Sequence, residues 1–420
     1  MASQPELQPR RAAELLGRIE ENVHHVIVGK NRVVRLAAAG LVAGGHVLLQ
    51  DLPGTGKTML ARALATSVGG SFRRIQCTPD LLPSDITGSS IFNQKELSFE
   101  FVPGPIFANI VLADEVNRAT PRTQSALLEA MGEGQVTIEG VTRTLGRPFF
   151  VIATQNPGEF HGTYPLPESQ LDRFILAAEI GPPSDAEAME VLARREHGDP
   201  IGDLGAVVSL ADVVELQEGC LRVVAAPAIR TYIVSLLDAI RSRPEVSLPA
   251  SMRSGVYLQR ASQAWALFEG RDFVLPDDVK LLAVPVLAHR LGMRGRAKAG
   301  DVLADVIASV PLPPLRHWYW PPRSSTTAAH RRSPGCSCSR TGSWRWSSQL
   351  FCMHSGIAIC AARFTFAPPR PAKAHRWNSC PKRFWAAGRS FPCSRATGCR
   401  SRFASRPAAV HAGPRASPAP

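Results

Sequence analysis

The stretch Asp51-Leu52-Pro53-Gly54-Thr55-Gly56-Lys57-Thr58 decides the fold. An apolar run at residues 46–50 leads into it, and a segment rich in helix-forming residues follows at 59–65. A strand, a glycine-bearing turn and a helix in this order make a phosphate site, because the N–H groups of the turn and of the helix start face one anion. Asp51 departs from the usual glycine, but Gly54 and Gly56 supply the backbone freedom that the bend needs. The stretch therefore predicts a nucleotide hydrolase of the P-loop class.

Two side chains of this loop carry the expected chemistry. Lys57 would reach the β- and γ-phosphates, and the Thr58 hydroxyl would take one place on Mg²⁺. Upstream, Val28 and Gly29 belong to a short apolar turn that would either pack on the adenine ring or anchor an ordinary loop. ATP and Mg²⁺ are the predicted cofactors, and the predicted nucleotide-binding residues of the loop are Pro53, Gly54, Thr55, Gly56, Lys57, Thr58 and Met59.

A second fixed point is the apolar run 109–113, which ends in Asp114 and Glu115. Such a run is typical of a central parallel strand, whose charged end lies at the sheet edge where the P-loop also opens. There Asp114 would hold Mg²⁺, directly or through water, and Glu115 would orient the attacking water or accept its proton. The alternative is a simple strand end without a catalytic role.

Three further polar residues are candidates for catalysis. Asn156 closes an apolar strand and would hold the hydrolytic water or the γ-phosphate, or would cap the Asn-Pro turn that follows. Arg173 precedes another apolar strand; it is a surface ion-pair residue, or an arginine finger if the nucleotide of a second subunit lies opposite. Arg253 begins a helix that could lower it onto the phosphates, and is otherwise an ordinary surface arginine.

The chain divides into three parts. After residue 182 the pattern changes from strands to helices, and periodicity predicts helices and no strand at 185–196, 211–222, 227–241, 252–269 and 276–290. Before that point, the long region 78–103 predicts a hairpin formed by 90–92 and 98–101. We therefore expect an α/β core with a central parallel sheet flanked by helices, an all-α lid and a tail, at residues 1–182, 183–322 and 323–420.

The formal charge of +13 is unevenly distributed. Residues 323–420 hold 17 Lys and Arg and no acid, so residues 1–322 carry 31 basic and all 35 acidic residues, a net charge of −4. This body gives no electrostatic reason to bind nucleic acid. Its two scattered cysteines, Cys77 and Cys220, provide no disulfide framework, and no signal peptide or membrane-spanning run is recognisable. We expect a soluble cytoplasmic body.

The tail, 323–420, allows two interpretations. It is either a genuine basic extension that binds nucleic acid or metal, or the product of translation in a wrong reading frame. Its seven cysteines contain no Cys-x₂-Cys pair, which argues against a structural zinc site. The absence of any carboxylate and of hydrophobic periodicity favours the second interpretation, and either one predicts a mostly disordered segment.

Taken in order, the motifs of residues 10–312 resemble those of the MoxR-type AAA+ ATPases. Asp51 agrees with this family, in which an acidic residue is frequent at that position, whereas Met252 stands where proline is usual. The tail lies outside the resemblance. The residues that carry it are Val28-Gly29, the P-loop, Leu112-Ala113-Asp114-Glu115-Val116-Asn117-Arg118-Ala119, Ala153-Thr154-Gln155-Asn156-Pro157, Tyr164-Pro165-Leu166-Pro167-Glu168-Ser169-Gln170-Leu171-Asp172-Arg173-Phe174, Ala250-Ser251-Met252-Arg253 and Gly270-Arg271-Asp272-Phe273-Val274-Leu275-Pro276-Asp277-Asp278-Val279.

The resemblance implies specific roles for the three open candidates. Asn156 would be sensor 1, Arg173 the arginine finger that acts on a neighbouring subunit, and Arg253 sensor 2 from the lid. It also implies a ring, expected to be a hexamer, with ATP at each subunit interface. Region 78–103 would include an insertion that contacts client proteins, and the family suggests a chaperone whose partners often contain von Willebrand A domains.

Two other functions stay open from the sequence. The first is a DNA-acting motor of the same superfamily, against which the net charge of −4 for residues 1–322 argues. The second is the motor subunit of a metal chelatase, which shares the same core. The preferred interpretation is an ATP-hydrolysing chaperone that remodels partner proteins.

Overall fold

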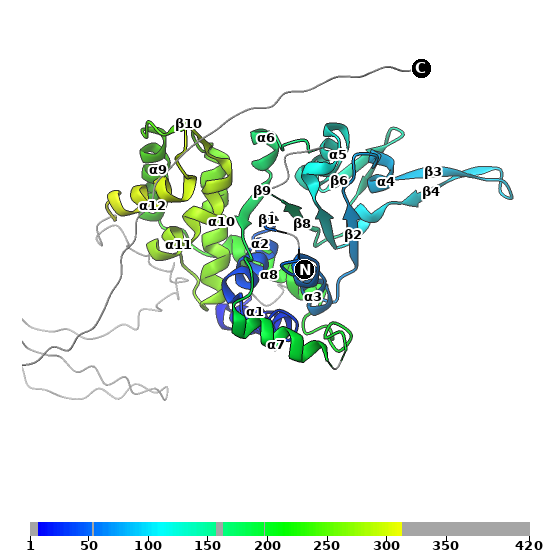
Figure 1. Ribbon diagram of the computed structural model, residues 1–420, viewed down its shortest axis with the longest axis horizontal. Coiled ribbons are helices and arrows are strands. Elements are labelled where there is room, and N and C mark those ends of the chain that lie inside the picture. Colours follow the sequence, from blue (N-terminus) through cyan, green and yellow to red (C-terminus); the bar gives the residue numbers. More distant parts are fainter. Residues whose placement is uncertain (1–6, 53, 157–162, 197, 313–420) are drawn as a thin grey trace, which may run out of the picture. The chain divides into compact units, whose positions relative to one another are not determined.

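A computed structural model describes residues 7–312, apart from Pro53, 157–162 and 197 (Figure 1). All of the described residues belong to one compact unit of the chain. The predictions that Pro53 binds nucleotide and that residues 323–420 form a basic or out-of-frame tail lie outside the described residues.

A parallel five-stranded sheet lies at the centre of the α/β part, in the order β2-β5-β8-β1-β9. The register aligns Gln76 with Asp114, and Leu49 with Thr154, so the carboxyl ends of neighbouring strands meet at one edge. The central strands form from continuous apolar runs because both faces of the sheet are covered by helices. The strands are β1 (His46–Gln50), β2 (Phe72–Gln76), β5 (Ile110–Asp114), β8 (Phe150–Gln155) and β9 (Phe174–Ala178).

Successive residues of these strands pack into two different hydrophobic clusters. In β5, Ile110 and Leu112 face the cluster that contains α1 (Pro9–His24), α2 (Asn31–Val42) and α3 (Lys57–Ser67). Val111 and Ala113 face the other cluster, which contains Leu127 and Leu128 of α5 (Pro121–Glu133). The predicted sheet flanked by helices is confirmed.

Two hairpins project from this core. The predicted hairpin in region 78–103 is confirmed as β3 (Gly88–Asn93) and β4 (Ser98–Pro103), which Figure 1 shows extending away from the sheet. A short helix, α4 (Pro83–Thr87), precedes it. The second hairpin pairs β6 (Gln135–Ile138) with β7 (Val141–Thr144). Short helical turns, η1 (Pro105–Phe107), η2 (Val116–Arg118) and α6 (Glu168–Leu171), complete the connections.

The second half of the described chain is mainly helical. The five predicted helices are confirmed as α7 (Asp185–Arg195), α8 (Leu210–Arg222), α9 (Pro227–Arg241), α10 (Met252–Phe268) and α11 (Pro276–Leu287), the last followed by η3 (Ala288–Arg290). A sixth helix, α12 (Ala299–Ser309), was not predicted, although the spacing of its buried Val302 and Val306 is helical. The prediction of no strand is wrong, because β10 (Val246–Leu248) pairs with β11 (Gly292–Met293). A pairing of two or three residues is too short to leave a pattern in the sequence.

The helical half is not separated from the sheet by a polar boundary. The hydrophobic cluster that contains α1, α2 and α3 continues through α8, α9, α10, α11 and α12. Leu7, before α1, packs so closely on α8 that a Cβ on Gly219 would come within 2.7 Å of its side chain. Among the helices of the described residues, none is long and apolar enough to cross a membrane.

Candidate nucleotide-binding site

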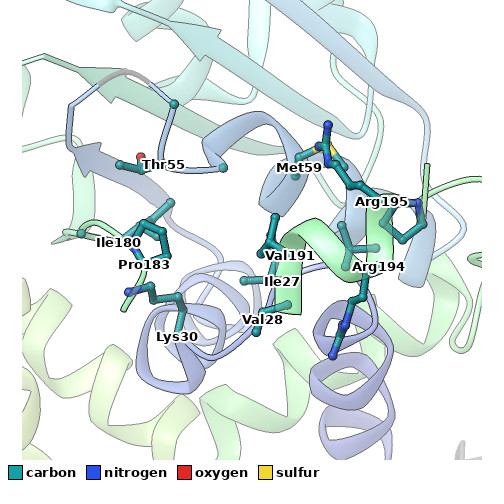
Figure 2. Close-up of a pocket in the computed structure, with 15 residues that line it drawn as sticks. Ile27, Val28, Lys30, Thr55, Met59, Ile180, Pro183, Val191, Arg194 and Arg195 are labelled. Atoms are coloured by element: carbon teal, nitrogen blue, oxygen red, sulfur yellow. The ribbon is translucent and has the colours of Figure 1, made fainter. Parts of the chain in front are cut away.

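Two adjoining cavities lie at the carboxyl edge of the sheet. The first has a volume of about 390 Å³ and is shown in Figure 2, and the second has a volume of about 370 Å³. Gly54, Gly56, Met59 and Arg195 line both cavities. A ligand with an apolar end and an anionic end could therefore extend from one cavity into the other across the P-loop.

The P-loop adopts the conformation that its glycines permit. Gly54 and Gly56 have φ angles of 84° and 91°, values that side-chain-bearing residues rarely adopt, and α3 begins at the next residue, Lys57. The Lys57 side chain folds against the loop, where its Nζ donates to the carbonyl oxygens of Asp51 at 2.8 Å and Leu52 at 3.2 Å. The loop therefore keeps a buried ammonium group beside its N–H groups, as a site for phosphates requires.

Asp51 has a role that its position in the motif did not predict. Its carboxylate is buried and accepts hydrogen bonds from the backbone N–H groups of Ile180, at 2.5 Å, and Gly181, at 2.9 Å. A glycine at position 51 could make neither bond. The carboxylate thus fastens the start of the P-loop to the segment that follows β9.

The second cavity collects the charged residues. Asp114 ends β5, and its two oxygens are bound differently: Oδ1 accepts from the hydroxyl of Thr154 at 2.6 Å, and Oδ2 accepts from Nη2 of Arg74 at 2.5 Å. The fully buried Thr154 also accepts from the backbone N–H of Glu115 at 2.8 Å. Thr154 therefore positions both acidic residues, a contact between β8 and β5 that no local motif reveals.

Glu115 follows Asp114 with a left-handed backbone, φ 56°, which directs its side chain along the edge of the cavity. Its Oε2 accepts from Nε2 of Gln76 at 3.1 Å and from Nη1 of Arg118 at 3.0 Å. The same cavity is lined by Lys57 and Thr58. A carboxylate held by two donors and facing a site for phosphates can orient a water molecule or accept its proton.

The residues present fit Mg²⁺. The Thr58 hydroxyl and the Asp114 carboxylate line the same cavity, and both are hard oxygen donors of the kind that Mg²⁺ prefers. A Mg²⁺ ion bound by proteins usually has one or two carboxylates as ligands, completed by water and substrate phosphates. Asp114 and Thr58 would supply the protein's share of such a set.

Apolar side chains form the walls of the first cavity. Val28 lies there with Ile27, Met59, Ile180 and Val191, as Figure 2 shows. Apolar walls of this kind suit a flat aromatic base. Val28 is therefore in the place that a contact with an adenine ring would require.

Gly29 does not line the cavity. Its φ is +64°, and an added Cβ would lie 1.9 Å from Oε1 of Glu187. The backbone N–H of Ser184 and the nearby Lys30 ammonium lower the pKa of Glu187, whose carboxylate pairs with Nζ of Lys30 at 3.2 Å. Gly29 thus leaves room for an ion pair that links the start of α2 to α7.

Helix α7 covers the first cavity with Val191, Arg194 and Arg195. Arg194 Nη1 donates to the carbonyl oxygens of His24 and His25, at 2.8 and 2.7 Å, and so attaches α7 to the end of α1. Arg195 lines both cavities and places a guanidinium group near the junction. Sequence reasoning missed Arg195 because it belongs to no motif.

Three predicted catalytic residues line neither cavity. Asn156 is buried just beyond the end of β8. Arg173 points to α5, where its Nη1 donates to the carbonyl oxygen of Leu128 at 2.5 Å. Arg253 is 59% exposed and lies 3.7 Å from Oδ2 of Asp172. The structure therefore brings Val28, Gly54, Thr55, Gly56, Lys57, Thr58, Met59, Asp114 and Glu115 to the two cavities, and leaves Gly29, Asn156, Arg173 and Arg253 outside their linings.

The chain matches two family models and several known proteins. Residues 46–176 match the ATPase family associated with various cellular activities, and residues 238–307 match the AAA lid domain. Protein YeaC of Bacillus subtilis, which is uncharacterised, is 50% identical over 73% of this chain and 94% of its own length. Chaperone MoxR1 of Mycobacterium tuberculosis is 40% identical over 68% of this chain and 78% of its own length.

A solved structure agrees with these matches. The crystal structure of a protein from Cytophaga hutchinsonii, described as a candidate ATPase, superposes with a TM-score of 0.68 at 35% identity. It covers 72% of this chain and 96% of its own. The P-loop, the acidic end of β5 and the helical half occur in the order expected of this family. The chain therefore belongs to the MoxR family of AAA+ ATPases.

Proposed function

We propose that this chain binds Mg·ATP and hydrolyses it to ADP and phosphate. The observation that carries the proposal is the second cavity, in which Lys57, Thr58, Asp114 and Glu115 face the same space. A phosphate-binding cation, two metal-ligand oxygens and a carboxylate for the attacking water are the parts that phosphoryl transfer needs. The apolar first cavity beside it supports a nucleotide rather than an isolated phosphate as the ligand.

Each residue would act in a defined place. Lys57 and the N–H groups of the P-loop would hold the phosphates, and Arg195, which lines both cavities, would contact the nucleotide where they join. Glu115 would orient the attacking water, because its carboxylate is fixed by Gln76 and Arg118 at the cavity edge. Mg²⁺ held by Thr58 and Asp114 would neutralise charge on the phosphates. Asn156, next to the end of β8, would assist as sensor 1.

We propose further that the functional form is a ring, expected to be a hexamer. Arg173 lies outside the linings of both cavities of its own chain, and the same holds for Arg253. Asp172 links their surroundings: it precedes Arg173 directly in the chain, lies 3.7 Å from Arg253, and pairs with Nε of Arg290 at 3.1 Å. This cluster supports action of both arginines on the nucleotide of a neighbouring subunit. Sensor 2 would then work between subunits rather than as a clamp within one.

A chaperone role is proposed from one relative and one surface. MoxR1 is named as a chaperone, and 40% identity joins it to this chain. The β3–β4 hairpin exposes large apolar side chains, Ile91, Phe92, Leu97 and Phe99, with exposed fractions of 46 to 78%. Such a surface suits contact with a client protein, and a von Willebrand A domain protein is the partner that the family suggests.

We propose that the protein works in the cytoplasm and that its clients are proteins. Cys77 and Cys220 are free, buried thiols, which is the usual state of cysteine in a reducing compartment. The net charge of −4 over residues 1–322 supports a protein client over nucleic acid.

Two substitutions test the ATPase proposal. Lys57→Ala should abolish nucleotide binding, measured by titration with a fluorescent ATP analogue, because it removes the buried ammonium group of the P-loop. Glu115→Gln should bind the nucleotide as wild type does but hydrolyse it at least about 10²-fold more slowly, measured by phosphate release. A Glu115→Gln protein that turns over at the wild-type rate would remove Glu115 from this role.

A further inference from the structure

The second cavity contains a cation of the protein's own at the place where the proposed metal would bind. Arg74, on β2, extends to Asp114 on the neighbouring strand β5. Its Nη2 and Nε lie 2.5 and 3.2 Å from Oδ2 of Asp114. Both nitrogens of one guanidinium edge therefore approach a single carboxylate oxygen.

The other oxygen of Asp114 is also taken. Oδ1 accepts the hydroxyl proton of the fully buried Thr154 at 2.6 Å. Thr154 is fixed there because it also accepts from the backbone N–H of Glu115 at 2.8 Å. Oδ2 is consequently the oxygen that remains for an ion in the cavity, and it is the one that Arg74 binds.

Arg74 and a divalent cation cannot both approach Oδ2 closely. A Mg²⁺ ligand distance is about 2.0–2.1 Å, so the ion and the guanidinium group would lie within a few ångströms of each other. Two positive charges at such a separation repel, and more strongly beside a carboxylate that is mostly removed from water. Asp114 has a side chain that is only 12% exposed.

Arg74 is able to leave without losing every partner. Its side chain is 48% exposed, and Nη2 also donates to Oε1 of Gln76 at 2.6 Å. Gln76 lies two residues further along the same strand and lines the same cavity. After release from Asp114, the guanidinium group would stay beside the phosphate-binding side of the cavity, attached to Gln76.

We propose that Arg74 competes with Mg²⁺ for Asp114 and so sets the Mg²⁺ concentration at which this chain binds nucleotide tightly. The Arg74–Asp114 ion pair opens when the metal enters and closes when it leaves. The inference rests on the proposed binding of Mg·nucleotide, and it makes Arg74 a positioning residue rather than a catalytic one.

The test measures Mg²⁺ dependence rather than turnover. Full-length wild type, Arg74→Gln and Arg73→Gln are each incubated with a fluorescent ADP analogue, and MgCl₂ is titrated from an EDTA-treated start. Arg73 is the matched control, because it is exposed, lies next to Arg74 on β2, and does not line the cavity. Successive strand residues point to opposite faces, so Arg73→Gln removes the same charge without touching Asp114.

Arg74→Gln should lower the Mg²⁺ midpoint by about two- to fivefold, the range that loss of a partly exposed competing ion pair allows. Arg73→Gln should leave the midpoint unchanged. Arg74→Lys, which keeps the charge but offers a single nitrogen to the carboxylate, should give a smaller shift in the same direction. In an Asp114→Asn background, Arg74→Gln should no longer shift the Mg²⁺ midpoint, because the carboxylate for which Arg74 and Mg²⁺ compete is absent.

A midpoint for Arg74→Gln that equals or exceeds that of Arg73→Gln would overturn the proposal. The same holds if Arg74→Gln weakens nucleotide binding equally with and without Mg²⁺, which would make Arg74 a phosphate ligand only. If Arg74→Gln does not fold, the direction of the shift in Arg74→Lys decides. Failure of the wild type to bind the analogue at any Mg²⁺ concentration would instead contradict the proposed function.

Discussion

The carboxylate of Asp51 joins two segments that lie far apart in the chain. It binds the backbone N–H groups of Ile180 and Gly181, which follow the edge strand β9, and it belongs to the P-loop by sequence. Ile180 and Gly181 also line the first cavity. A single side chain therefore holds the P-loop against the wall of the first cavity.

Asp51→Gly, which introduces the glycine usual in the motif, should lower both the stability of the fold and the affinity for nucleotide. It leaves two N–H groups without their acceptor, and each such loss costs about 1–3 kcal/mol when the group is buried. We expect a lower urea midpoint and weaker binding of a fluorescent nucleotide. Asp51→Asn keeps one acceptor oxygen and should lie between wild type and Asp51→Gly. Equal midpoints for all three proteins would contradict this role.

Residues within motifs were predictable, and residues that support them from other strands were not. The sequence predicted that Lys57, Thr58, Asp114 and Glu115 would meet at one sheet edge, because two short local patterns each end a strand there, and the four residues line one cavity. Thr154 reaches Asp114 across 40 residues of sequence, and only the strand register brings the two together. Arg74, Arg195 and the partners of Asp51 were not predicted for the same reason. Each contributes through a contact between two elements, and such a contact leaves no pattern within either element.

His46 is the first residue of β1, at the end of the strand away from the P-loop, and it connects three elements. Its Nδ1 accepts from the backbone N–H of Val151 in β8 at 3.0 Å, and its Nε2 donates to the carbonyl oxygen of Met131 in α5 at 3.0 Å. Burial lowers the pKa of His46 to about 4, because the charged ring would lose its hydration. Both hydrogen bonds belong to the neutral imidazole, which is the form that the fold stabilises.

Protonation of His46 should lower the free energy of unfolding at acidic pH. The folded-state pKa of about 4 lies below the ordinary value of 6.5, so the contribution is complete above pH 6.5 and is lost as the pH falls toward 4. The loss amounts to about 2 kcal/mol at pH 5. The glutamine in His46→Gln offers one acceptor and one donor without titrating, so its urea midpoint should change less between pH 7.5 and 5.0. An unchanged pH dependence would contradict the assignment.

The β3–β4 hairpin should act on clients and not on nucleotide. Leu97 and Phe99 are 78% and 75% exposed, and the cavities lie elsewhere. The double variant Leu97→Ser/Phe99→Ser should keep the basal ATPase rate and lose at least half of the stimulation by an unfolded model protein, reduced α-lactalbumin. Val141→Ser, on the β6–β7 hairpin, is the control for removal of an exposed apolar side chain. Full stimulation of the double variant would exclude the hairpin as the contact.

Whole elements were predictable where the pattern was long enough. The strands β1, β5, β8 and β9 follow apolar runs, the helices α7 to α11 follow helical periodicity, and the β3–β4 hairpin surrounds a polar turn. The β10–β11 pair was not predictable, because two or three residues carry no period. The pairing depends on the helices that bring Val246 and Met293 together.

At the scale of the molecule, two predicted catalytic arginines are missing from the cavities of their own chain. Arg173 and Arg253 flank Asp172, away from the linings of both cavities of their own chain. Asp172 also pairs with Arg290, whose side chain is 2% exposed, so this cluster is anchored in the helical half. Under the ring proposal, an arginine of one subunit completes the site of the next, and such a finger contributes about 10³–10⁵ in rate.

Mixing two inactive variants should therefore restore activity. Arg173→Ala keeps its own cavities, and Lys57→Ala keeps its arginine, so a mixed ring contains interfaces with every required group. Phosphate release should rise above that of either variant alone. A mixture of Lys57→Ala with Glu115→Gln is the control, because each chain is defective in its own cavity and no interface is complete. Absence of rescue at every mixing ratio would count against the ring.

Helix α7 lies over the first cavity although none of its described residues is buried. It is held instead by the Lys30–Glu187 ion pair near its start and by the bonds from Arg194 to two carbonyl oxygens near its end. Attractions between partly exposed charges weaken as ionic strength rises, whereas those of buried groups, such as Asp51 and Lys57 in the P-loop, are screened much less. Added salt should therefore weaken the attachment of α7 over the first cavity, while the P-loop keeps its conformation.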